Sequence, residues 1–437
     1  MKQRIKNIVT SSIFLAGLLS LSLSGGRAVP GESLEWPQGR FVKLYWYEKG
    51  IEHGNPFYNH RFRVNSPEAV LLPGVMDRPE ARGNGMMQIL MEENLGLITG
   101  AALYLEIWGG HPGTSDKRVT LNGRTPYLLP EVGTAGGYCT HSYPRIPLKL
   151  TDLVNGYNAI QFACGQGTSF WGHFIVDNAS LMAVLQPDHP DLSAAGFQDF
   201  QADVLAMPPP PGEEKIPLRL DCPGSFHDVM ARVDYWGFYE GYDENGNTQT
   251  LDWHGFTKNR EPQAILGSSN ISPFEMEWDT RMLPAQDSMA VKAVIHFHKH
   301  PNLVYITPPL AEIEKPASGG KTVKLLPSES LPRPFWSRAG QKKSCVILLD
   351  EDPGIIERAE LYIVIWDGGF GTVKSPFTLN GVPLAVAGNG RHDVLYQVLP
   401  LDPSILRKGE NRFEVFSDTE HHGIEVLLPG PALMVRY

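Results

Sequence analysis

Hydrophobic and polar residues alternate with a period of two in many short segments of the chain, which is typical of half-buried β-strands. Glycine and proline, with 44 and 36 residues among 437, interrupt these segments at short intervals. This punctuation favours many short strands over long helices. The pattern therefore predicts an all-β protein. The clearest alternating segments are 103–108, 158–162, 229–233, 289–296, 361–366 and 411–415.

The chain also resembles itself. At an offset of 258 residues LYLEIW (103–108) matches LYIVIW (361–366), and the tripeptide Leu-Asn-Gly occurs at 121–123 and again at 379–381. After a deletion of five residues the offset becomes 253, and Gly-x-Asn occurs at 156–158 and 409–411. Matches at fixed spacing over several anchor points indicate a duplicated domain.

Each copy runs from a strand into an Asn-Gly hairpin signal, then through Pro-Leu and a Gly-x-Asn turn into another strand. This order is similar to that of the galactose-binding-like jelly roll, a β-sandwich that recurs in carbohydrate-binding modules and in accessory domains of glycoside hydrolases. The resemblance covers roughly 85–185 and 343–437 and implies a jelly-roll fold for both copies. Because this superfamily also contains purely structural members, the ligand does not follow from the fold.

The segment between the copies predicts a further β domain. Four consecutive prolines at 208–211 indicate a stiff linker, and 214–312 has the size and strand pattern of an immunoglobulin-like sandwich. The expected organisation is a signal peptide (1–28), a first jelly roll (29–187), a Pro-rich linker (188–213), an immunoglobulin-like β-sandwich (214–312) and a second jelly roll (313–437).

The N-terminus has the features of a secretory signal. Lys2, Arg4 and Lys6 precede an apolar stretch at 13–23, and small residues lead to a cleavage site after Ala28. The stretch is too short to span a bilayer, so we expect a secreted protein (extracellular, periplasmic or at the cell surface) without membrane insertion. Cleavage removes four of 38 basic and none of 48 acidic residues, and the resulting acidic balance disfavours nucleic acid as a partner.

The cysteines suggest a disulfide in the first copy. At the offset of 253, Cys139 corresponds to His392 and Cys164 to Ser417, so both cysteines are present in one copy and both are absent from the other. This joint presence predicts that the two positions touch and that Cys139 and Cys164 form a disulfide. Cys222 and Cys345 either bridge across the linker or, as we favour, remain small buried hydrophobes.

Polar and aromatic residues gather in equivalent loops of the two copies. Aromatic rings stack on the apolar side of a pyranose, while carboxylates and imidazoles bind its hydroxyls, so these loops are candidates for glycan binding. The alternative is that the tryptophans are core residues and the loops merely polar. The candidate ligand-binding residues are Trp366, Asp367, His392, Asp393, Asp418, His421, His422 and Glu425 in copy two and Trp171 and His173 in copy one.

Two groups of histidines are candidates for metal binding. His421 and His422 are adjacent and have carboxylates nearby, and His296 and His298 alternate on one predicted strand. The sequence indicates no definite cofactor, and the alternative is a structural calcium or another divalent metal. A strand end entering a turn explains the second group equally well.

The leading hypothesis is a non-catalytic, secreted carbohydrate-binding or cell-surface adhesion protein whose partner is a polysaccharide or another glycan. The alternative is a carbohydrate-active enzyme, either a glycan amidase or a polysaccharide-degrading enzyme, that uses the His/Asp/Glu cluster of the second jelly roll. A structural spacer is the third hypothesis. No nucleophile motif occurs, so the catalytic residues of an enzyme stay unknown, and the sequence leaves the oligomeric state open.

Overall fold

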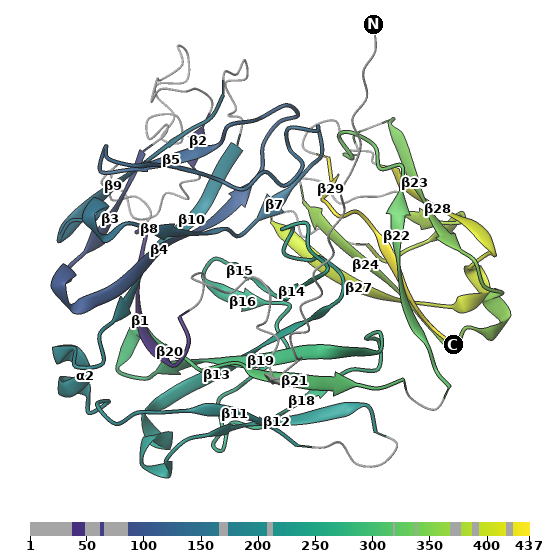
Figure 1. Cartoon of the computed structure of the whole chain (residues 1–437). Coiled ribbons are helices and arrows are strands. Elements are labelled where there is room, and N and C mark those ends of the chain that lie inside the picture. The colour runs from purple at the N-terminus through teal and green to yellow at the C-terminus, as the bar shows by residue number, and fades with distance from the viewer. Residues whose placement is uncertain are drawn as a thin grey trace, which may run out of the picture. The chain divides into compact units, whose positions relative to one another are not determined.

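The computed structural model describes residues 37–48, 62–64, 86–165, 174–207, 213–317, 320–336, 338, 340–367, 377–386, 393–416 and 423–437. Nearly all regular structure in these ranges is β-strand, and every strand pair is antiparallel, so the predicted all-β class is confirmed (Figure 1). The described residues belong to one compact unit, Ser33–Tyr437. None of the helices in these ranges combines the length and the apolar character that crossing a bilayer requires.

Among the described residues, twelve strands form one continuous sheet, which draws strands from both the first predicted jelly roll and the predicted immunoglobulin-like segment. Its strands are β1 (Arg40–Trp46), β2 (Phe62–Val64), β4 (Ile98–Trp108), β7 (His141–Ser142), β8 (Arg145–Leu148), β10 (Phe174–Leu185), β13 (Met230–Glu240), β14 (Leu251–Trp253), β17 (Gly267–Ser269), β19 (Gln286–Phe297), β20 (His300–Ile306) and β21 (Leu310–Lys315). The main path runs β14-β13-β19-β20-β1-β10-β4-β7.

Strand β1 makes this sheet continuous. One edge of β1 pairs with β10 and the other with β20, so that Val42 lies opposite both Val184 and Val304. Val42 is fully buried. The strand therefore satisfies its backbone groups on both sides and joins the two halves of the sheet.

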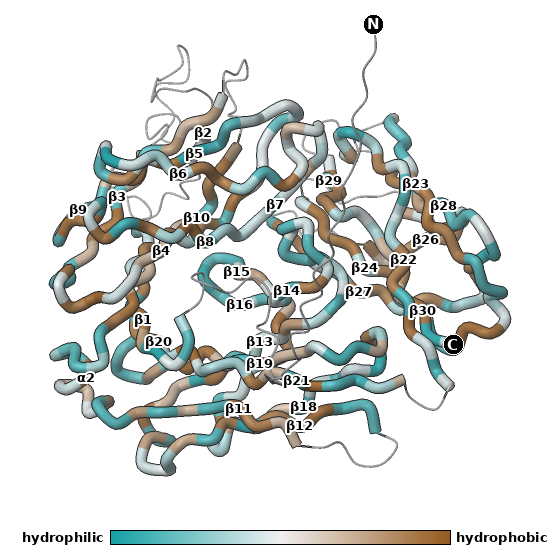
Figure 2. The backbone as a smooth tube through the Cα atoms, in the orientation of Figure 1, coloured by the Kyte–Doolittle hydropathy of each residue, from teal (hydrophilic) through white to brown (hydrophobic). Residues whose placement is uncertain are grey.

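Two smaller sheets cover one face of the continuous sheet and enclose a common hydrophobic core with it. Side chains such as Leu103, Phe162, Leu218 and Ile295 are buried in this core. In Figure 2 hydrophobic residues follow strands such as β4 and β10, while hydrophilic residues gather in the turns. The smaller sheets consist of β3 (Met86–Met91), β5 (Arg118–Leu121), β6 (Pro126–Leu128) and β9 (Gly156–Ala163), and of β11 (Asp203–Ala206), β12 (Lys215–Asp221) and β18 (Met276–Asp279).

The second predicted jelly roll has a separate core. Strand β22 pairs with β23 through its last residues and with β30 through its first, which connects the two layers of the sandwich. Leu361 and Leu433 from one layer and Ile347 and Phe413 from the other are buried between them. The strands are β22 (Val323–Glu329), β23 (Lys342–Leu349), β24 (Arg358–Trp366), β25 (Thr378–Leu379), β26 (Val382–Pro383), β27 (Val394–Leu401), β28 (Gly409–Phe416), β29 (Glu425–Val426) and β30 (Ala432–Arg436).

Helical structure in the described ranges is short. The α-helix α2 (Pro190–Ala195) and strand β11 both lie within 188–213, the range expected to be a linker, and the predicted domain boundaries stay predictions. The remaining helical segments are the 3-10 turns η2 (Leu95–Leu97), η3 (Leu150–Asp152), η4 (Gly224–Val229), η5 (Pro353–Ile355) and η6 (Pro403–Ile405), and the hairpin β15 (Phe256–Lys258) and β16 (Glu261–Gln263) completes the strands.

The two jelly-roll segments contain corresponding elements in the same order. β4 and β24 end at residues 108 and 366, η2 and η5 begin at 95 and 353, and β9 and β28 begin at 156 and 409. Both Asn-Gly pairs form tight turns in the left-handed region, with φ of 49° at Asn122 and 54° at Asn380. The duplication itself stays a hypothesis, which these correspondences favour.

A buried asparagine organises the Gly-x-Asn turn of the first segment. The Asn158 amide oxygen accepts hydrogen bonds from the Val154 N–H (3.0 Å) and from Asn122 Nδ2 (2.8 Å). Its amide nitrogen donates to the carbonyl oxygens of Val154 (2.9 Å) and Gly156 (3.1 Å). All four hydrogen-bonding positions of the amide are thus filled, as the full burial of this polar side chain requires.

The second segment repeats this arrangement atom by atom. The Asn411 amide oxygen accepts from the Arg407 N–H and from Asn380 Nδ2, both at 2.8 Å, and its amide nitrogen donates to the carbonyl oxygens of Arg407 (2.8 Å) and Gly409 (3.2 Å). The asparagine of each Gly-x-Asn turn thus closes its own turn and ties it to the Asn-Gly hairpin.

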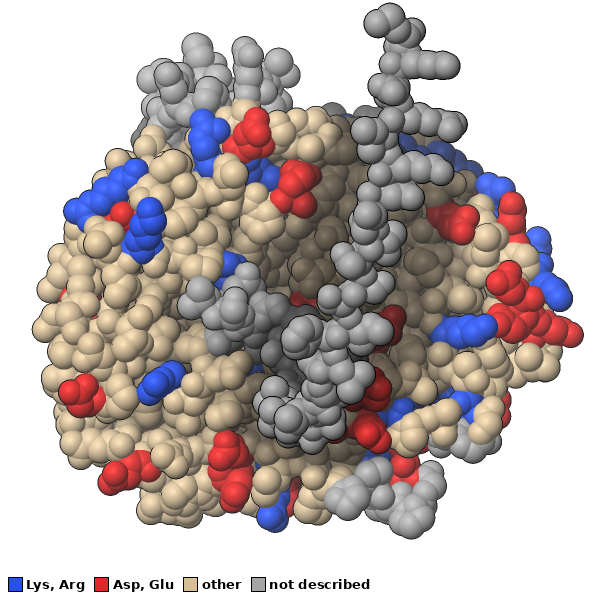
Figure 3. Space-filling view, viewed as in Figure 1, with Lys and Arg blue, Asp and Glu red and all other residues tan. Residues whose placement is uncertain are grey.

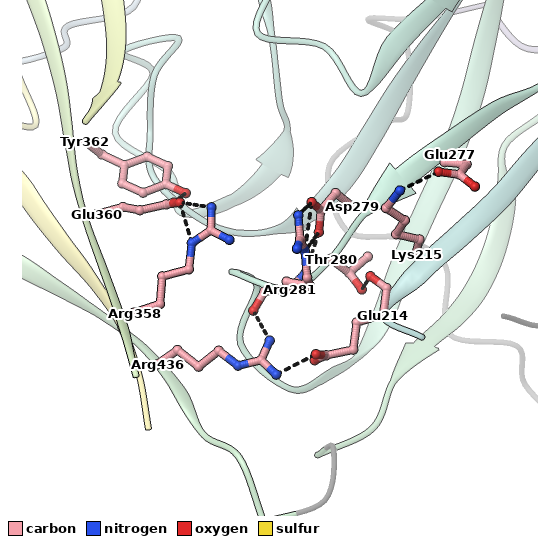
Figure 4. A network of polar contacts seen from close by, with 10 residues as sticks. All are labelled: Glu214, Lys215, Glu277, Asp279, Thr280, Arg281, Arg358, Glu360, Tyr362 and Arg436. Atoms are coloured by element: carbon pink, nitrogen blue, oxygen red, sulfur yellow. Dashed lines mark hydrogen bonds and ion pairs between the residues drawn. The ribbon is translucent and has the colours of Figure 1, made fainter. Parts of the chain in front are cut away.

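Charged residues join the second jelly roll to the middle segment (Figure 4). The Arg436 guanidinium lies 2.6 Å from the Glu214 carboxylate and also donates to the Arg281 carbonyl oxygen at 3.0 Å. Burial raises the pKa of Glu214, but the hydrogen bonds from Arg436 and Lys315 outweigh it and leave the pKa lowered. Glu214, Lys315 and Arg436 are mostly buried, so removing one partner would leave an uncompensated charge at this contact.

We expect Asn411→Ala to lower the free energy of unfolding by roughly 3 kcal/mol, because it leaves buried backbone groups without partners. Chemical denaturation monitored by tryptophan fluorescence measures the change. Lys408→Ala, at a neighbouring exposed position, is the control and should change stability little. Equal stability of both variants would contradict the role given to Asn411.

Candidate functional site

A pocket lies between the continuous sheet and the β15–β16 hairpin, which Figure 1 shows on the inner side of the bend of the sheet. Its sheet residues all lie on one face, because strands point alternate side chains to opposite faces and the residues between them enter the core. The pocket is lined by Leu44, Trp46, Tyr104, Arg145, Ser180, Met182, Asp234, Trp236, Thr257, Arg260, Pro262, Val294, His296, Val304 and Ile306.

Three aromatic side chains form part of the pocket wall. Trp46 comes from β1, Tyr104 from β4 and Trp236 from β13, and the rings of Trp46 and Tyr104 meet edge to face with centroids 6.1 Å apart. Two guanidinium groups lie over these rings: Arg260 lies 5.2 Å from the centroid of Trp46 and Arg145 lies 5.4 Å from that of Tyr104. Tyr104 and Trp236 are only 4% and 5% exposed, so Trp46 is the most accessible of the three rings.

One carboxylate, Asp234, belongs to the lining, and several neighbours bind it. His296 Nε2 lies 2.9 Å from Asp234 Oδ2, the Ser268 hydroxyl donates to Oδ1 at 2.6 Å, and Arg232 Nε lies 3.0 Å from Oδ1. Burial raises the pKa of Asp234, but the hydrogen bonds and charges of His296, Ser268 and Arg232 together outweigh burial, and the pKa is lowered. Asp234 is therefore ionised at neutral pH, and its negative charge is stabilised by the neighbouring groups that bind it.

Glu106 holds the hairpin over the sheet. Its carboxylate, which is 3% exposed, accepts hydrogen bonds from the Thr257 hydroxyl (2.7 Å) and from the N–H groups of Asn259 and Arg260 (both 3.3 Å). Asn259 and Arg260 form the turn of the hairpin and have positive φ, 50° and 75°. Burial raises the pKa of Glu106. Tyr104, also in the pocket, is hydrogen bonded to Thr257.

Arg260 ties the same turn to the end of β1. Its guanidinium donates to the Tyr47 carbonyl oxygen at 2.8 Å and to a Glu48 carboxylate oxygen at 3.3 Å. The hairpin is thus attached both to β4, through Glu106, and to β1, which positions Thr257, Arg260 and Pro262 as the roof of the pocket.

Sequence reasoning singled out one residue of this pocket, His296, and missed the others. The local signal exists, because the segment LYLEIW places Tyr104 and Glu106 on the face opposite to that of the hydrophobic core. Nothing in the sequence shows that Trp46 and Trp236 lie on the same face of the same sheet. That relation requires the long-range pairing of β1 with β20.

The structure brings together two predicted ligand-binding residues, Trp366 and Glu425, which are paired across β24 and β29. They contact the first jelly roll, where Trp108 Nε1 donates to the Glu425 carboxyl at 3.0 Å and the rings of Trp108 and Trp366 lie 6.4 Å apart. Glu425 is 7% exposed, and burial raises its pKa to about 7. These residues therefore lie in a contact between the two segments.

Two further predicted residues, Asp367 and Asp393, are joined through their backbones, where the Asp367 N–H donates to the Asp393 carbonyl oxygen at 2.8 Å. The side chain of Asp367 is buried, and that of Asp393 pairs with Lys258 at 3.0 Å. The other candidates lie outside the described residues, so their role stays a prediction. They are His392, Asp418, His421, His422, Trp171 and His173.

The predicted disulfide between Cys139 and Cys164 is wrong, since both thiols are free. Cys164 lies in the common core of the continuous sheet and the two smaller sheets, where its thiol approaches the Val64 carbonyl oxygen at 3.7 Å. Cys139 lies in a different hydrophobic cluster, with Tyr242 and Val364. The two positions are thus separated because the loop that carries Cys139 packs toward the second segment, where the Cys139 carbonyl accepts from the Leu428 N–H.

The histidines proposed for metal binding at the end of β19 occupy different environments. His296 is hydrogen bonded to Asp234 at the pocket, whereas His298 is exposed in the following turn. Within the described ranges, Glu93, His189 and Asp191 are the group whose ligand atoms lie close enough for a metal ion.

The arrangement of this group favours a hydrogen-bond network over a metal site. Lys43 Nζ lies 2.9 Å from the Glu93 carboxylate and also pairs with Asp191, so an ammonium group already supplies the positive charge. His189 Nδ1 accepts from the Asp191 N–H, which leaves the proton on Nε2, and Nε2 donates to Glu93 at 2.9 Å. A metal ion at Nε2 would require the loss of that proton.

No protein-family model and no curated protein matches the chain. Among solved structures, a beta-porphyranase of glycoside hydrolase family 86 from the human gut bacterium Bacteroides plebeius is 14% identical over 55% of this chain and 36% of its own, with a TM-score of 0.22. BuGH86 in complex with neoagarooctaose is 10% identical over 61% and 39%, with a TM-score of 0.22. An exo-beta-1,3-galactanase from Phanerochaete chrysosporium is 10% identical over 55% and 56%, with a TM-score of 0.17. This chain spans less than two thirds of each of these three solved chains.

We expect Glu425→Gln to remove a pH dependence of stability. Because the folded state holds the Glu425 proton up to about pH 7 and the ordinary pKa is 4.5, the stability of the wild type falls as pH rises through this window. The variant keeps the acceptor for Trp108 and should be more stable at pH 8 by roughly 3 kcal/mol. Thermal denaturation at pH 5 and pH 8 measures the difference, with the exposed Glu410→Gln as the control. An equal pH dependence of wild type and Glu425→Gln would contradict the buried protonated carboxyl.

Titration of thiols in denaturant should give four thiols per chain without reduction, because the four cysteines are free in the folded protein. The same titration after reduction should give the same number. Two thiols before reduction and four afterwards would show a disulfide and contradict the structure.

Proposed function

We propose that the protein is a secreted, non-catalytic carbohydrate-binding protein and that a glycan contacts Trp46 at the pocket beneath the β15–β16 hairpin. The observation that carries the proposal is the convergence of Trp46, Tyr104 and Trp236 with Arg145 and His296 around one pocket. Aromatic faces stack on the apolar side of a pyranose, and a few polar groups fix its orientation.

The distribution of carboxylates favours binding over hydrolysis. Glycoside hydrolysis generally uses two carboxyl groups on either side of the scissile bond. Among the described residues that line the pocket, Asp234 is the one carboxylate, and it is held by His296, Ser268 and Arg232. Glu106 lies behind the hairpin and accepts three hydrogen bonds there, so it serves to position the roof.

The surface charge agrees with a glycan partner. Lysine and arginine are interspersed with aspartate and glutamate on the face shown in Figure 3, without a continuous basic field of the kind that nucleic acid requires. Secretion through the predicted signal peptide belongs to the same proposal. The loops of the second jelly roll that carry His392 and His421 are proposed as a second contact with a polymer, which would add avidity.

The test compares Trp46→Ala with the wild type on a glycan array and in pull-down with insoluble polysaccharides. Removing the stacking surface should weaken binding about tenfold or more, since aromatic stacking contributes roughly 1 kcal/mol beyond its buried area. Trp336→Ala is the matched control, because Trp336 is also partly buried but lies outside the pocket. Circular dichroism confirms that both variants are folded.

Loss of binding in Trp46→Ala with retention in Trp336→Ala would support the pocket. Equal binding by all three proteins would exclude the pocket, and a complete lack of binding across the panel would exclude carbohydrate binding. Release of oligosaccharide products in the same samples would show an enzyme and overturn the non-catalytic assignment.

A further inference from the structure

We infer that an apolar groove in the middle segment binds an extended peptide in which lysine or arginine alternates with aliphatic residues. The groove lies between β11 and β21 and shares no lining residue with the pocket beneath the β15–β16 hairpin. Its volume of about 380 Å³ falls within the range of ligand-binding clefts. The inference therefore concerns a second site, independent of the proposed glycan contact.

Aliphatic side chains from both sheets form the walls of the groove. Ile216 on β12 is buried, Leu310 and Ile313 on β21 are half-buried, and Met207 is 46% exposed. A ligand can therefore reach part of the apolar wall from solvent. The described lining contains no aromatic side chain, so it lacks the stacking surface that a sugar ring prefers. The walls suit the aliphatic side chains of a peptide better than they suit a saccharide.

The edge of β11 that borders the groove has no strand partner among the described residues. β11 is the terminal strand of its sheet and pairs with β12 alone. The Met207 N–H donates to the Pro217 carbonyl oxygen at 2.9 Å, so the backbone of Met207 faces β12. Because neighbouring residues of a strand direct their backbone groups to opposite edges, those of Ala206 face away from β12. An extended peptide can pair with them as an added strand.

Carboxylates on the rim of the groove determine the charge of the ligand. Glu213, Glu312 and Glu314 are exposed and have no ion-pair or hydrogen-bond partner within the described ranges. Lys315, the basic residue of the described lining, already binds Glu214 at 3.1 Å. The rim carboxylates are not among the described groups that are close enough to hold a metal ion. Cationic groups spaced along a peptide match them better than a single ion does.

An extended peptide meets both requirements, because its successive side chains point to opposite faces. Aliphatic residues directed into the groove would contact Ile216 and Ile313, and basic residues at the alternate positions would face the rim. Main-chain hydrogen bonds to the β11 edge would supply affinity, and the side chains would supply selectivity.

The experiment measures the binding of fluorescein-labelled peptides to the full chain by fluorescence anisotropy. The peptides alternate lysine with valine, isoleucine, leucine or threonine. One set of control peptides carries glutamate in place of lysine. A second set is methylated on every other backbone nitrogen, in both registers, and cannot pair fully with a strand edge. The wild type should bind at least one basic peptide, about tenfold more tightly than either control, and added salt should weaken the binding.

A triple variant tests the location of the site. Glu213→Gln/Glu312→Gln/Glu314→Gln removes the unpaired carboxylates and should weaken binding about tenfold, since each exposed ion pair contributes a factor of roughly two to five.

The matched control for this variant removes the same number of charges at exposed positions outside the groove and should bind as the wild type does. It is Glu275→Gln/Glu329→Gln/Glu410→Gln.

The inference is overturned if no basic peptide of the panel binds, or if both triple variants weaken binding equally, since the attraction would then come from the net charge of the protein. Equal binding of the methylated peptides would exclude pairing with the edge of β11 and overturn it as well. Glucosamine oligosaccharides are measured in the same assay by competition. Binding of these oligosaccharides that depends on Glu213, Glu312 and Glu314, without binding of any peptide, would assign the groove to a cationic glycan instead.

Discussion

The pairing of β1 on both of its edges is the interaction on which the rest of the structure depends. Without β1, β10 and β20 would each present an open edge, and the first jelly roll and the middle segment would be separate sheets. With β1 in place, one continuous face carries residues of seven strands into the pocket. β1 itself contributes Leu44 and Trp46, so the strand that joins the halves also forms part of the site.

The hairpin above this face is held in place at its turn. Its turn places two residues other than glycine, Asn259 and Arg260, at positive φ. The Glu106 carboxylate binds both of their N–H groups, and the Arg260 side chain is anchored on the end of β1. Burying the Glu106 carboxylate costs free energy, and the three hydrogen bonds from the hairpin offset that cost. Moving the hairpin away would break these bonds and leave the carboxylate without partners. The roof of the pocket is therefore part of the rigid scaffold.

Much of the fold was predictable because its signals are local. The alternation of LYLEIW predicted β4, and the Asn-Gly pairs at Asn122 and Asn380 predicted tight turns that the φ values confirm. The failures concern relations between distant segments. The joint presence of Cys139 and Cys164 in one copy suggested contact, yet the loop of Cys139 packs against another segment.

The pocket escaped prediction for the same reason. Each of its strands carries an ordinary alternating pattern, and the sequence does not state which faces of which strands meet. Trp46 and Trp236 are far apart along the chain and share a surface only through the order β13-β19-β20-β1. The loops of the second jelly roll drew attention because their polar residues are contiguous, which is a property of sequence rather than of space.

The four free cysteines have a consequence for how the chain reaches its folded state. Burial raises the pKa of the Cys164 thiol to about 11 and that of Cys345 to about 12, so at neutral pH the folded protein presents almost no thiolate to an oxidant. The unfolded chain lacks this protection, and its thiols have the reactivity of ordinary cysteine. In an oxidising compartment, folding and oxidation therefore compete, and a chain that closes its cores first escapes mispaired cross-links. Refolding should accordingly give its highest yield in the presence of a reductant, although the native protein needs none.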